Sequence, residues 1–338
     1  MRIEKIGVIG AGSWGTALAF HLAGKGFSVH LWAYEPEVHA SIRNQRENTL
    51  FLPGVQLPDN IRSTNSLEEA VAEKDLLLFA VPTHVLRRVL SQAAPGIAPE
   101  VLLVNAGKGI ETENLVTPSR IFRDVLGEGC DRVFSVLSGP TFARELIHHT
   151  PAAATVASLS EETAQAAQNV FLTSFFKIFI SHDPLGVEIG GALKNVMAIA
   201  AGTSDGLGFG YNARAFLITR GLAEMMRLGS AMGANPQTLS GLSGMGDLIL
   251  TCTGDLSRNR TVGLQLAQGK KREEIQREMK MVAEGIKTAY SAYHLLKKYN
   301  ISAAIIEEVY AILYEDKAPR QALADLMKRK IGIEFTGI

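Results

Sequence analysis

The stretch Ile6-Gly7-Val8-Ile9-Gly10-Ala11-Gly12-Ser13-Trp14-Gly15 decides the fold of the amino-terminal half. A short apolar run of strand type leads into a turn with GxGxxG spacing, and a segment of helical periodicity follows at residues 14–24. In such a turn Gly10 allows the sharp bend, Gly12 lets a pyrophosphate approach the backbone, and Gly15 lets the helix pack closely on the strand. The motif alone is weak, and a glycine turn without a ligand is the alternative. A second strand expected at 29–33 supplies the context that dinucleotide binding requires.

Strand-like and helix-like segments alternate through the first half of the chain. We expect further strands at 75–81, 101–105, 133–137, 153–158 and 176–181, separated by helices at 36–48, 66–73, 83–93, 113–126 and 160–173. This alternation predicts an α/β domain with a doubly wound, mostly parallel sheet of the Rossmann type. After about residue 182 helical periodicity dominates, so we expect an all-α second domain. The predicted domains are 1–182 and 183–338.

Composition narrows the class of protein. Of 338 residues, 46% are hydrophobic and 20% charged, and 34 Lys and Arg balance 34 Asp and Glu. Zero net charge argues against nucleic acid or an anionic membrane as the main partner, although a local basic pocket for a small anion is compatible with it. Two cysteines, Cys130 and Cys252, lack metal-ligand spacing and are too few for a disulfide framework, so we expect no metal. We expect a cytoplasmic protein with no signal peptide and no stable membrane insertion.

The end of the second strand is where the adenosine ribose of a dinucleotide is usually read. That region is Ala33-Tyr34-Glu35-Pro36. Tyr34 could stack on the adenine, and Glu35 is either a ligand of the ribose hydroxyl or a solvated surface acid. No arginine stands at the strand end to bind a 2′-phosphate, although Arg43 lies one helix later.

Polar residues follow three later strands. The segments are Val81-Pro82-Thr83, Asn105-Ala106-Gly107-Lys108-Gly109 and Ser138-Gly139-Pro140-Thr141-Phe142. In doubly wound sheets the ligand lies outside the carboxyl ends of the strands. Lys108 stands between two glycines at one of these ends, so it is a candidate to face the ligand, against the alternative of an ordinary loop lysine.

Lys194 is the most informative residue of the second half. It lies in the apolar helical segment Gly190-Gly191-Ala192-Leu193-Lys194-Asn195, and the two glycines share its helix face. A lysine surrounded by apolar groups has a lowered pKa, which suits proton transfer near neutral pH. The alternative is a lysine whose amine reaches solvent from an amphipathic helix.

Two further segments carry polar side chains at the start of expected helices. Asp247 follows Gly244-Met245-Gly246, and it could cap its helix, hold a substrate hydroxyl or pair with Lys194. Ser257-Arg258-Asn259-Arg260 combines a serine cap with two arginines, which makes either an anion site or an ordinary cap.

Taken together, these motifs resemble those of the bacterial NAD(P)-dependent glycerol-3-phosphate dehydrogenases. The matching segments run in order along the chain: 10–15, 105–109, 138–146, 190–195, 204–210, 241–253, 257–260 and 282–285. The resemblance implies a cytoplasmic oxidoreductase, usually a homodimer, that interconverts sn-glycerol 3-phosphate and dihydroxyacetone phosphate with NAD or NADP. It would feed glycerophospholipid synthesis.

The resemblance also implies roles for individual residues. Lys194 would be the general base, with Lys108 and Asp247 completing the catalytic set. The substrate would be held by Lys108, Gly139, Thr141, Lys194, Asp247, Ser257, Arg258 and Asn259. The cofactor would be bordered by Gly10, Gly12, Ser13, Trp14, Gly15, Tyr34, Lys108, Ala143, Arg258, Val282 and Glu284. Many relatives carry histidine or arginine in place of Tyr34, which leaves the choice between NAD and NADP open.

Two rival functions fit parts of the pattern. A related dehydrogenase for another hydroxy acid would share the fold and a catalytic lysine, but it has less use for the Ser-Arg-Asn-Arg segment. A sensor that binds NAD(H) without turnover would need neither Lys108 nor Lys194.

Overall fold

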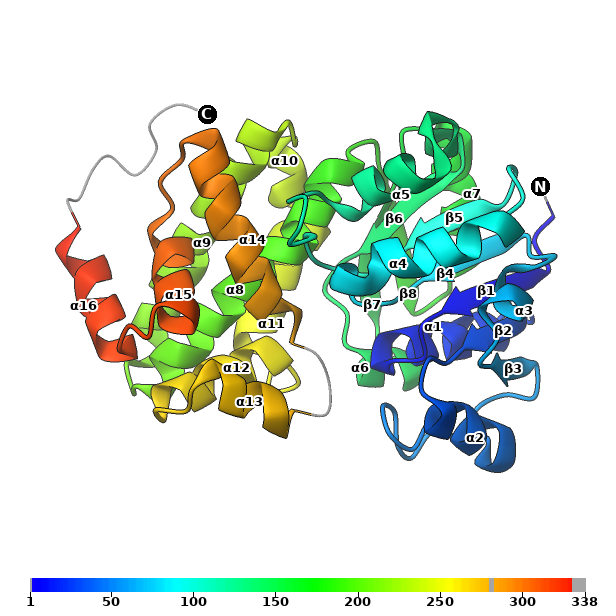
Figure 1. Ribbon diagram of the computed structural model, residues 1–338, viewed down its shortest axis with the longest axis horizontal. Helices are drawn as coiled ribbons and strands as arrows, with labels where there is room; N and C mark the ends of the chain where they lie inside the picture. The colour runs from blue at the N-terminus through cyan, green and yellow to red at the C-terminus, as the bar shows by residue number, and fades with distance from the viewer. Residues whose placement is uncertain (1, 280–282, 330–338) are drawn as a thin grey trace.

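The computed structural model describes residues 2–279 and 283–329, which form an eight-stranded sheet followed by a helical part (Figure 1). The strand order is β3-β2-β1-β4-β5-β6-β7-β8, and all neighbours are parallel except β6 and β7. The strands are β1 Lys5–Ile9, β2 Ser28–Trp32, β3 Ile61–Thr64, β4 Leu76–Phe79, β5 Leu102–Asn105, β6 Phe134–Ser138, β7 Ala152–Ala157 and β8 Phe176–Ser181. The predicted doubly wound, mostly parallel sheet is therefore confirmed.

Helices cover both faces of this sheet. The helices are α1 Ser13–Gly24, α2 Pro36–Gln45, α3 Leu67–Val71, α4 Thr83–Ala93, α5 Pro118–Leu126, α6 Ala143–Ile147 and α7 Glu161–Phe171. One apolar core joins the sheet to α1 and α7 through side chains such as Leu22 and Phe171, and a second joins the opposite face to α4 and α5 through Leu90 and Phe122. Because the sheet is covered on both faces, β4 and β5 are buried along their whole length, and their side chains are apolar except for Asn105 at the end of β5.

The helical part is arranged around one long central helix. Its helices are α8 Pro184–Gly206, α9 Gly210–Met232, α10 Pro236–Leu239, α11 Asp247–Thr253, α12 Arg258–Ala267, α13 Arg272–Glu278, α14 Glu284–Tyr299, α15 Ala304–Tyr314 and α16 Pro319–Lys328. By length and composition α8 could cross a membrane, yet 89% of its most apolar window is buried inside the fold. Its apolar character is thus explained by its place at the centre of the helical core.

The structure corrects several expected element bounds. The helix expected from residue 113 begins only at Pro118, because a residue before proline is disfavoured in the helical region and Leu115 has a left-handed φ of 56°. Helix α2 ends at Gln45, followed by the left-handed Arg46. Strand β3 and the short helix α6 were not predicted, since the sequence Ile-Arg-Ser-Thr of the edge strand β3 has one apolar side chain.

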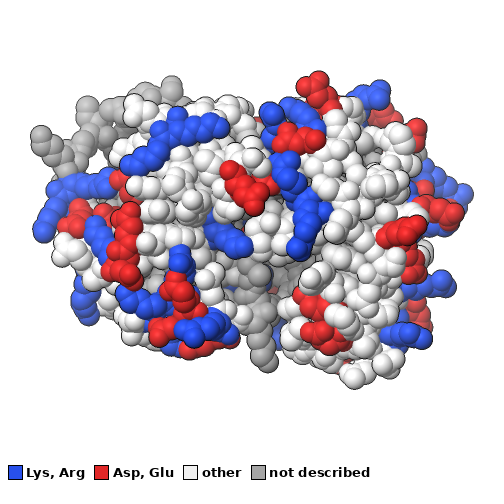
Figure 2. Space-filling view, viewed as in Figure 1, with Lys and Arg blue, Asp and Glu red and all other residues white. Residues whose placement is uncertain are grey.

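Lysine, arginine, aspartate and glutamate are interspersed over the face shown in Figure 2. No extended surface of one sign appears on this face, as the balanced composition predicts.

Candidate active site

The glycine turn lies at the carboxyl end of β1 and leads directly into α1. Gly10 has a φ of 117°, and a Cβ atom on Gly15 would lie 1.9 Å from the carbonyl oxygen of Gly10. At Gly12, by contrast, a Cβ would meet nothing within 4 Å. Gly10 and Gly15 are therefore required by the fold, whereas Gly12 leaves open space beside the start of α1, which fits the pyrophosphate of a dinucleotide.

A buried asparagine that the sequence analysis missed holds this turn in place. The Nδ2 of Asn48 donates hydrogen bonds to the carbonyl oxygen of Ala11 and to Oγ1 of Thr16, both at 2.8 Å. The Oγ of Ser13 donates to the carbonyl oxygen of Phe51 at 2.6 Å. No sequence signal marks Asn48, because it stands in an irregular segment far from the motif that it supports.

The other residues predicted at the cofactor end lie around this turn. The Trp14 ring packs against Leu52 and Ile147. Its buried Nε1 forms no hydrogen bond with any residue that the structure describes. The Tyr34 side chain is 67% exposed, with its ring edge-on to Trp32 at 6.1 Å. Tyr34 is therefore exposed just after the end of β2, so its ring is accessible to a ligand, and its stacking on an adenine stays a prediction.

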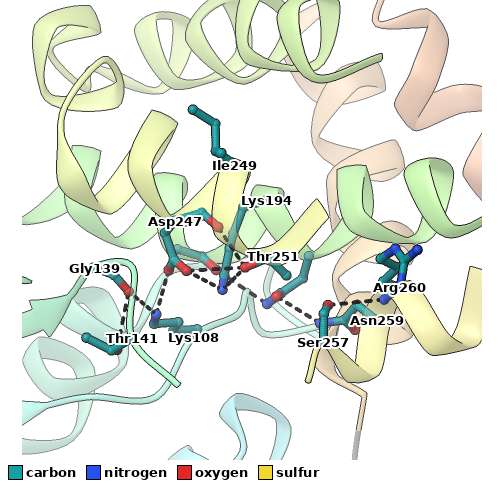
Figure 3. A network of polar contacts seen from close by, with 12 residues as sticks. Lys108, Gly139, Thr141, Lys194, Asp247, Ile249, Thr251, Ser257, Asn259 and Arg260 are labelled. Atoms are coloured by element: carbon teal, nitrogen blue, oxygen red, sulfur yellow. Dashed lines mark hydrogen bonds and ion pairs between the residues drawn. The ribbon is translucent and has the colours of Figure 1, made fainter. Parts of the chain in front are cut away.

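Lys194 and Lys108 converge on one carboxylate, although they come from the two different parts of the chain (Figure 3). The Nζ of Lys194 lies 2.7 Å from Oδ1 of Asp247 and donates a second hydrogen bond, also 2.7 Å, to Oγ1 of Thr251. The Nζ of Lys108 lies 2.5 Å from Oδ2 of Asp247 and donates to the carbonyl oxygen of Gly139 at 3.1 Å. Of the roles considered for Asp247, the structure thus shows the contact with Lys194.

Thr251 is a site residue absent from the predicted set. It follows Asp247 by one helical turn, and its Oγ1 donates to the Asp247 carbonyl oxygen at 2.6 Å. Spacing of four residues on an expected helix is the signal that could have found it.

Burial sets the electrostatics of this group. The side chains of Lys194 and Asp247 are only 9% and 1% exposed. The pKa of Lys194 is lowered to about 8 because burial disfavours its charged form; the carboxylate of Asp247 opposes this effect, and the cation of Lys108 adds to it. Lys194 can therefore both donate and accept a proton near neutral pH.

The two glycines before Lys194 serve different neighbours. A Cβ on Gly190 would lie 2.7 Å from the carbonyl oxygen of Ser243, so this glycine admits the π-helical turn Leu242–Gly246 that leads into α11. A Cβ on Gly191 would lie 2.8 Å from Oγ of Ser138 and 3.4 Å from Cγ of Lys108. The bare helix face predicted from sequence is therefore what lets α11 and Lys108 approach Lys194.

The start of α12 brings together the predicted Ser-Arg-Asn-Arg segment. Ser257 caps the helix by accepting a hydrogen bond from the Arg260 N–H at 3.2 Å, and Arg260 pairs with Asp205 at 2.9 Å. Asn259 donates to Oδ1 of Asn195 at 2.8 Å and accepts from the Gly285 N–H at 2.9 Å. Asn259 thus ties α12 to α8 and to the first turn of α14.

Arg258 is solvent-exposed, whereas Arg260 is half-buried against Asp205. Desolvation by the neighbouring protein lowers the pKa of Arg258, and the charge of Glu284 acts in the opposite direction. Burial likewise raises the pKa of Glu284 to about 7, against the hydrogen bond from the Thr83 backbone and the charge of Arg258. A Cβ on Gly109 would lie 3.0 Å from Glu284 Oε2, so the loop that carries Lys108 passes directly beside this carboxyl.

The remaining predicted residues follow β6. Gly139 lies against β7, where a Cβ would be 2.6 Å from Cα of Ala154, and the Oγ1 of Thr141 donates to the Gly139 carbonyl oxygen at 3.3 Å. Ala143 is the first residue of α6. Val282, predicted at the cofactor, lies outside the described residues.

A GxGxxG turn at the carboxyl end of a parallel strand, together with a buried lysine able to transfer a proton, is the combination typical of a nicotinamide-dependent oxidoreductase. The chain belongs to the NAD-dependent glycerol-3-phosphate dehydrogenase family. The family models for the N-terminus and the C-terminus match residues 5–164 and 183–324.

Individual relatives match over nearly their whole length. The chain is 57% identical to the glycerol-3-phosphate dehydrogenase (NAD(P)+) of Geobacter metallireducens, covering 96% of this chain and 97% of the relative. It is 56% identical to the enzyme of the same name from Geobacter sulfurreducens, covering 98% and 99%. The crystal structure of glycerol-3-phosphate dehydrogenase from Coxiella burnetii superposes with a TM-score of 0.93 at 35% identity, covering 97% and 99%.

Proposed function

We propose that this protein interconverts sn-glycerol 3-phosphate and dihydroxyacetone phosphate with NAD or NADP, and that Lys194 transfers the proton. The observation that carries the proposal is the Lys194 amine, buried with a lowered pKa and held by Asp247 and Thr251. The family of the chain supplies the substrate pair.

The cofactor fits the glycine turn at the end of β1. We assign the pyrophosphate to Gly10, Gly12, Ser13, Trp14 and Gly15, because Gly12 leaves room beside the start of α1. Tyr34 is assigned to the adenosine end, and Lys108, Ala143, Arg258, Val282 and Glu284 border the remainder. When bound, the nicotinamide supplies or accepts the hydride.

Lys194 is the acid in ketone reduction and the base in alcohol oxidation. Its Nζ gives a proton to the carbonyl oxygen of the ketone as negative charge develops there, and it takes the proton back from the hydroxyl in the reverse direction. Asp247 and Thr251 orient this amine by accepting two of its three N–H donors. The third donor is left for the substrate oxygen.

Lys108 and the start of α12 hold the substrate. The Lys108 amine lies beside the reacting oxygen, stabilises negative charge on it and keeps the pKa of Lys194 low. Gly139 and Thr141 line the same side. Ser257, Arg258 and Asn259 grip the phosphate at the helix N-terminus, where N–H groups and the guanidinium of Arg258 favour a dianion.

The division of labour follows the two parts of the chain. We assign residues 1–182 to cofactor binding and 183–338 to substrate binding and catalysis. The protein acts as a cytoplasmic homodimer and supplies the glycerol phosphate backbone for phospholipid synthesis. The family resemblance supports these assignments.

The test is the absorbance of reduced nicotinamide in purified protein with dihydroxyacetone phosphate, with NADH and NADPH assayed separately. The proposal predicts loss of absorbance that depends on the phosphorylated ketone, and the ratio of the two rates gives the cofactor preference. Folded protein that consumes neither cofactor would remove the proposed substrate. Consumption of the cofactor with a keto acid instead of this ketone would favour a hydroxy acid dehydrogenase.

A further inference from the structure

The loop that carries Lys108 leaves the sheet and packs into the helical part. This Lys108 loop, residues 106–117, joins β5 to α5. Ile110 is 2% exposed and belongs to the apolar core formed by the helices α8, α14 and their neighbours, and Leu115 packs against the same core. The loop therefore connects two elements of the sheet part, but its apolar side chains pack in the core of the helical part.

Two buried polar side chains of the helical part fasten this loop. Ser291 of α14 donates to the carbonyl oxygen of Ile110 at 3.1 Å. Glu188 of α8 accepts from the Ser119 N–H and from the Ser119 Oγ, both at 2.6 Å, and so caps the first turn of α5 where the loop ends. Thr117 also bonds to this carboxyl.

The loop contains a residue with a strained backbone conformation, and it also makes contacts with the sheet part. Leu115 has a φ of 56°, a conformation that residues other than glycine seldom adopt and that persists only where surroundings enforce it. Arg87 of α4 grips Glu111 through two hydrogen bonds of 2.7 and 3.0 Å, and Asn114 donates to the same carboxylate at 2.8 Å.

We propose that Glu188 is a positioning residue for Lys108, fixing the Lys108 loop to the same helix that carries Lys194. Glu188 precedes Lys194 by six residues on α8, and both are buried. Because one rigid helix holds the loop anchor and the proton donor, the spacing of the two lysines around Asp247 is set within the helical part. This inference rests on the proposed function.

The chain offers a matched control in Glu224. This glutamate is also buried, and its two oxygens accept from the N–H groups of Ile305 and Ile306 at the start of α15, at 2.9 to 3.2 Å. Burial raises the pKa of both carboxyls to about 7. Glu224 therefore has the chemistry of Glu188 without a bond to the Lys108 loop.

The experiment compares Glu188→Ala, Glu188→Gln and Glu224→Ala in the full-length protein. For each we measure kcat and KM for the ketone and for the reduced cofactor, the pH dependence of kcat, and amide hydrogen exchange of residues 110–117 without ligands. The charged or titratable groups that face Lys194 are Asp247, Lys108 and Cys252. The charge of Asp183 raises the pKa of Glu188.

In Glu188→Ala we expect kcat to fall by about tenfold or more, because small displacements of a catalytic group are costly, while KM for the cofactor changes much less, because the glycine turn is untouched. Loss of the nearby cation raises the pKa of Lys194, so the fall of kcat with rising pH moves to higher pH. Exchange of 110–117 accelerates. Glu188→Gln, which keeps an acceptor, recovers most of kcat, and Glu224→Ala changes none of the three readouts.

Equal effects of Glu188→Ala and Glu224→Ala, or an unmoved pH profile and exchange rate in Glu188→Ala, would overturn the proposal. Should Glu188→Ala fail to fold, the double variant Ser119→Ala with Ser291→Ala loosens the same loop. It removes the hydroxyl bond from Ser119 to Glu188 and the bond from Ser291 of α14 to Ile110, and the expected readouts are the same. If the wild-type protein does not reduce dihydroxyacetone phosphate, the proposed function fails first, whereas hydrogen exchange still tests the fastening of the loop.

Discussion

Replacing Asp247 with asparagine tests the electrostatic account of the site. The carboxylate lies between two ammonium groups, 2.7 Å from Lys194 and 2.5 Å from Lys108, and its side chain is 1% exposed. Asparagine keeps the shape but removes the charge. The burial of Lys194 and the cation of Lys108 then act on the Lys194 pKa without the opposing effect of this carboxylate, so this pKa falls below its value of about 8.

The size of the effect follows from the interaction that is lost. A hydrogen bond to a charged group contributes about 1.5–3 kcal/mol, and one pKa unit corresponds to about 1.4 kcal/mol, so we expect the pKa to fall by about one to two units. Ketone reduction needs protonated Lys194. At a pH of about 8 the protonated fraction would fall from about one half to about one tenth or less, which lowers turnover at least about fivefold.

The assay is the pH dependence of kcat for reduction of dihydroxyacetone phosphate, between about pH 6 and pH 9. The decline of kcat toward high pH should begin about one unit or more earlier in Asp247→Asn than in the wild type. Asp255→Asn is the control, because Asp255 is exposed and pairs only at the surface with Arg260. A decline at the same pH in Asp247→Asn, or one moved to higher pH, would refute the reasoning.

Three further predictions concern the cofactor turn, the phosphate and stability. Gly12→Val should leave the melting temperature unchanged but weaken cofactor binding, measured by fluorescence titration. Gly15→Val should lower the melting temperature strongly, because its Cβ would lie 1.9 Å from the Gly10 carbonyl oxygen. The reverse order of effects would contradict the assigned roles. Arg258→Ala should lower kcat/KM for the phosphorylated ketone by about tenfold to 100-fold, because a charge-assisted hydrogen bond is lost. Activity on unphosphorylated dihydroxyacetone should change much less. Equal losses on both ketones would argue against a phosphate contact. The carboxyl of Glu224 has its pKa raised from 4.5 to about 7 in the fold, so the folded state binds more protons in that interval and stability is lost as pH rises through it. Chemical denaturation at a series of pH values should therefore show a smaller decline in Glu224→Gln, and an identical decline would contradict the burial of a neutral carboxyl.

Most of the sheet could be predicted because its signals are local. The strand and glycine turn at 6–15 and the apolar runs of β4 and β5 carry their own patterns. Strand β3 could not be predicted, since an edge strand with one buried apolar residue has no periodic pattern. The helix expected from residue 113 starts only at Pro118, because of the restriction before proline and the tertiary contacts of the Lys108 loop.

The site was predicted in part for the same reason. Lys108, Lys194 and Asp247 each stand in a local motif, and the structure brings their side chains together. The sequence does not show that the two lysines share the Asp247 carboxylate, because Lys108 and Asp247 are 139 residues apart. Asn48 and Glu188 support the site through contacts that are distant in sequence and belong to no motif, so only the fold shows them.

The most direct test of the central claim is the turnover of Lys194→Ala with dihydroxyacetone phosphate, measured together with the dissociation constant of the reduced cofactor. The account predicts that turnover falls by about 100-fold or more, the usual worth of a general acid, while cofactor affinity is kept. Turnover close to that of the wild type in a folded variant would show that another group delivers the proton, and the proposed mechanism would be wrong.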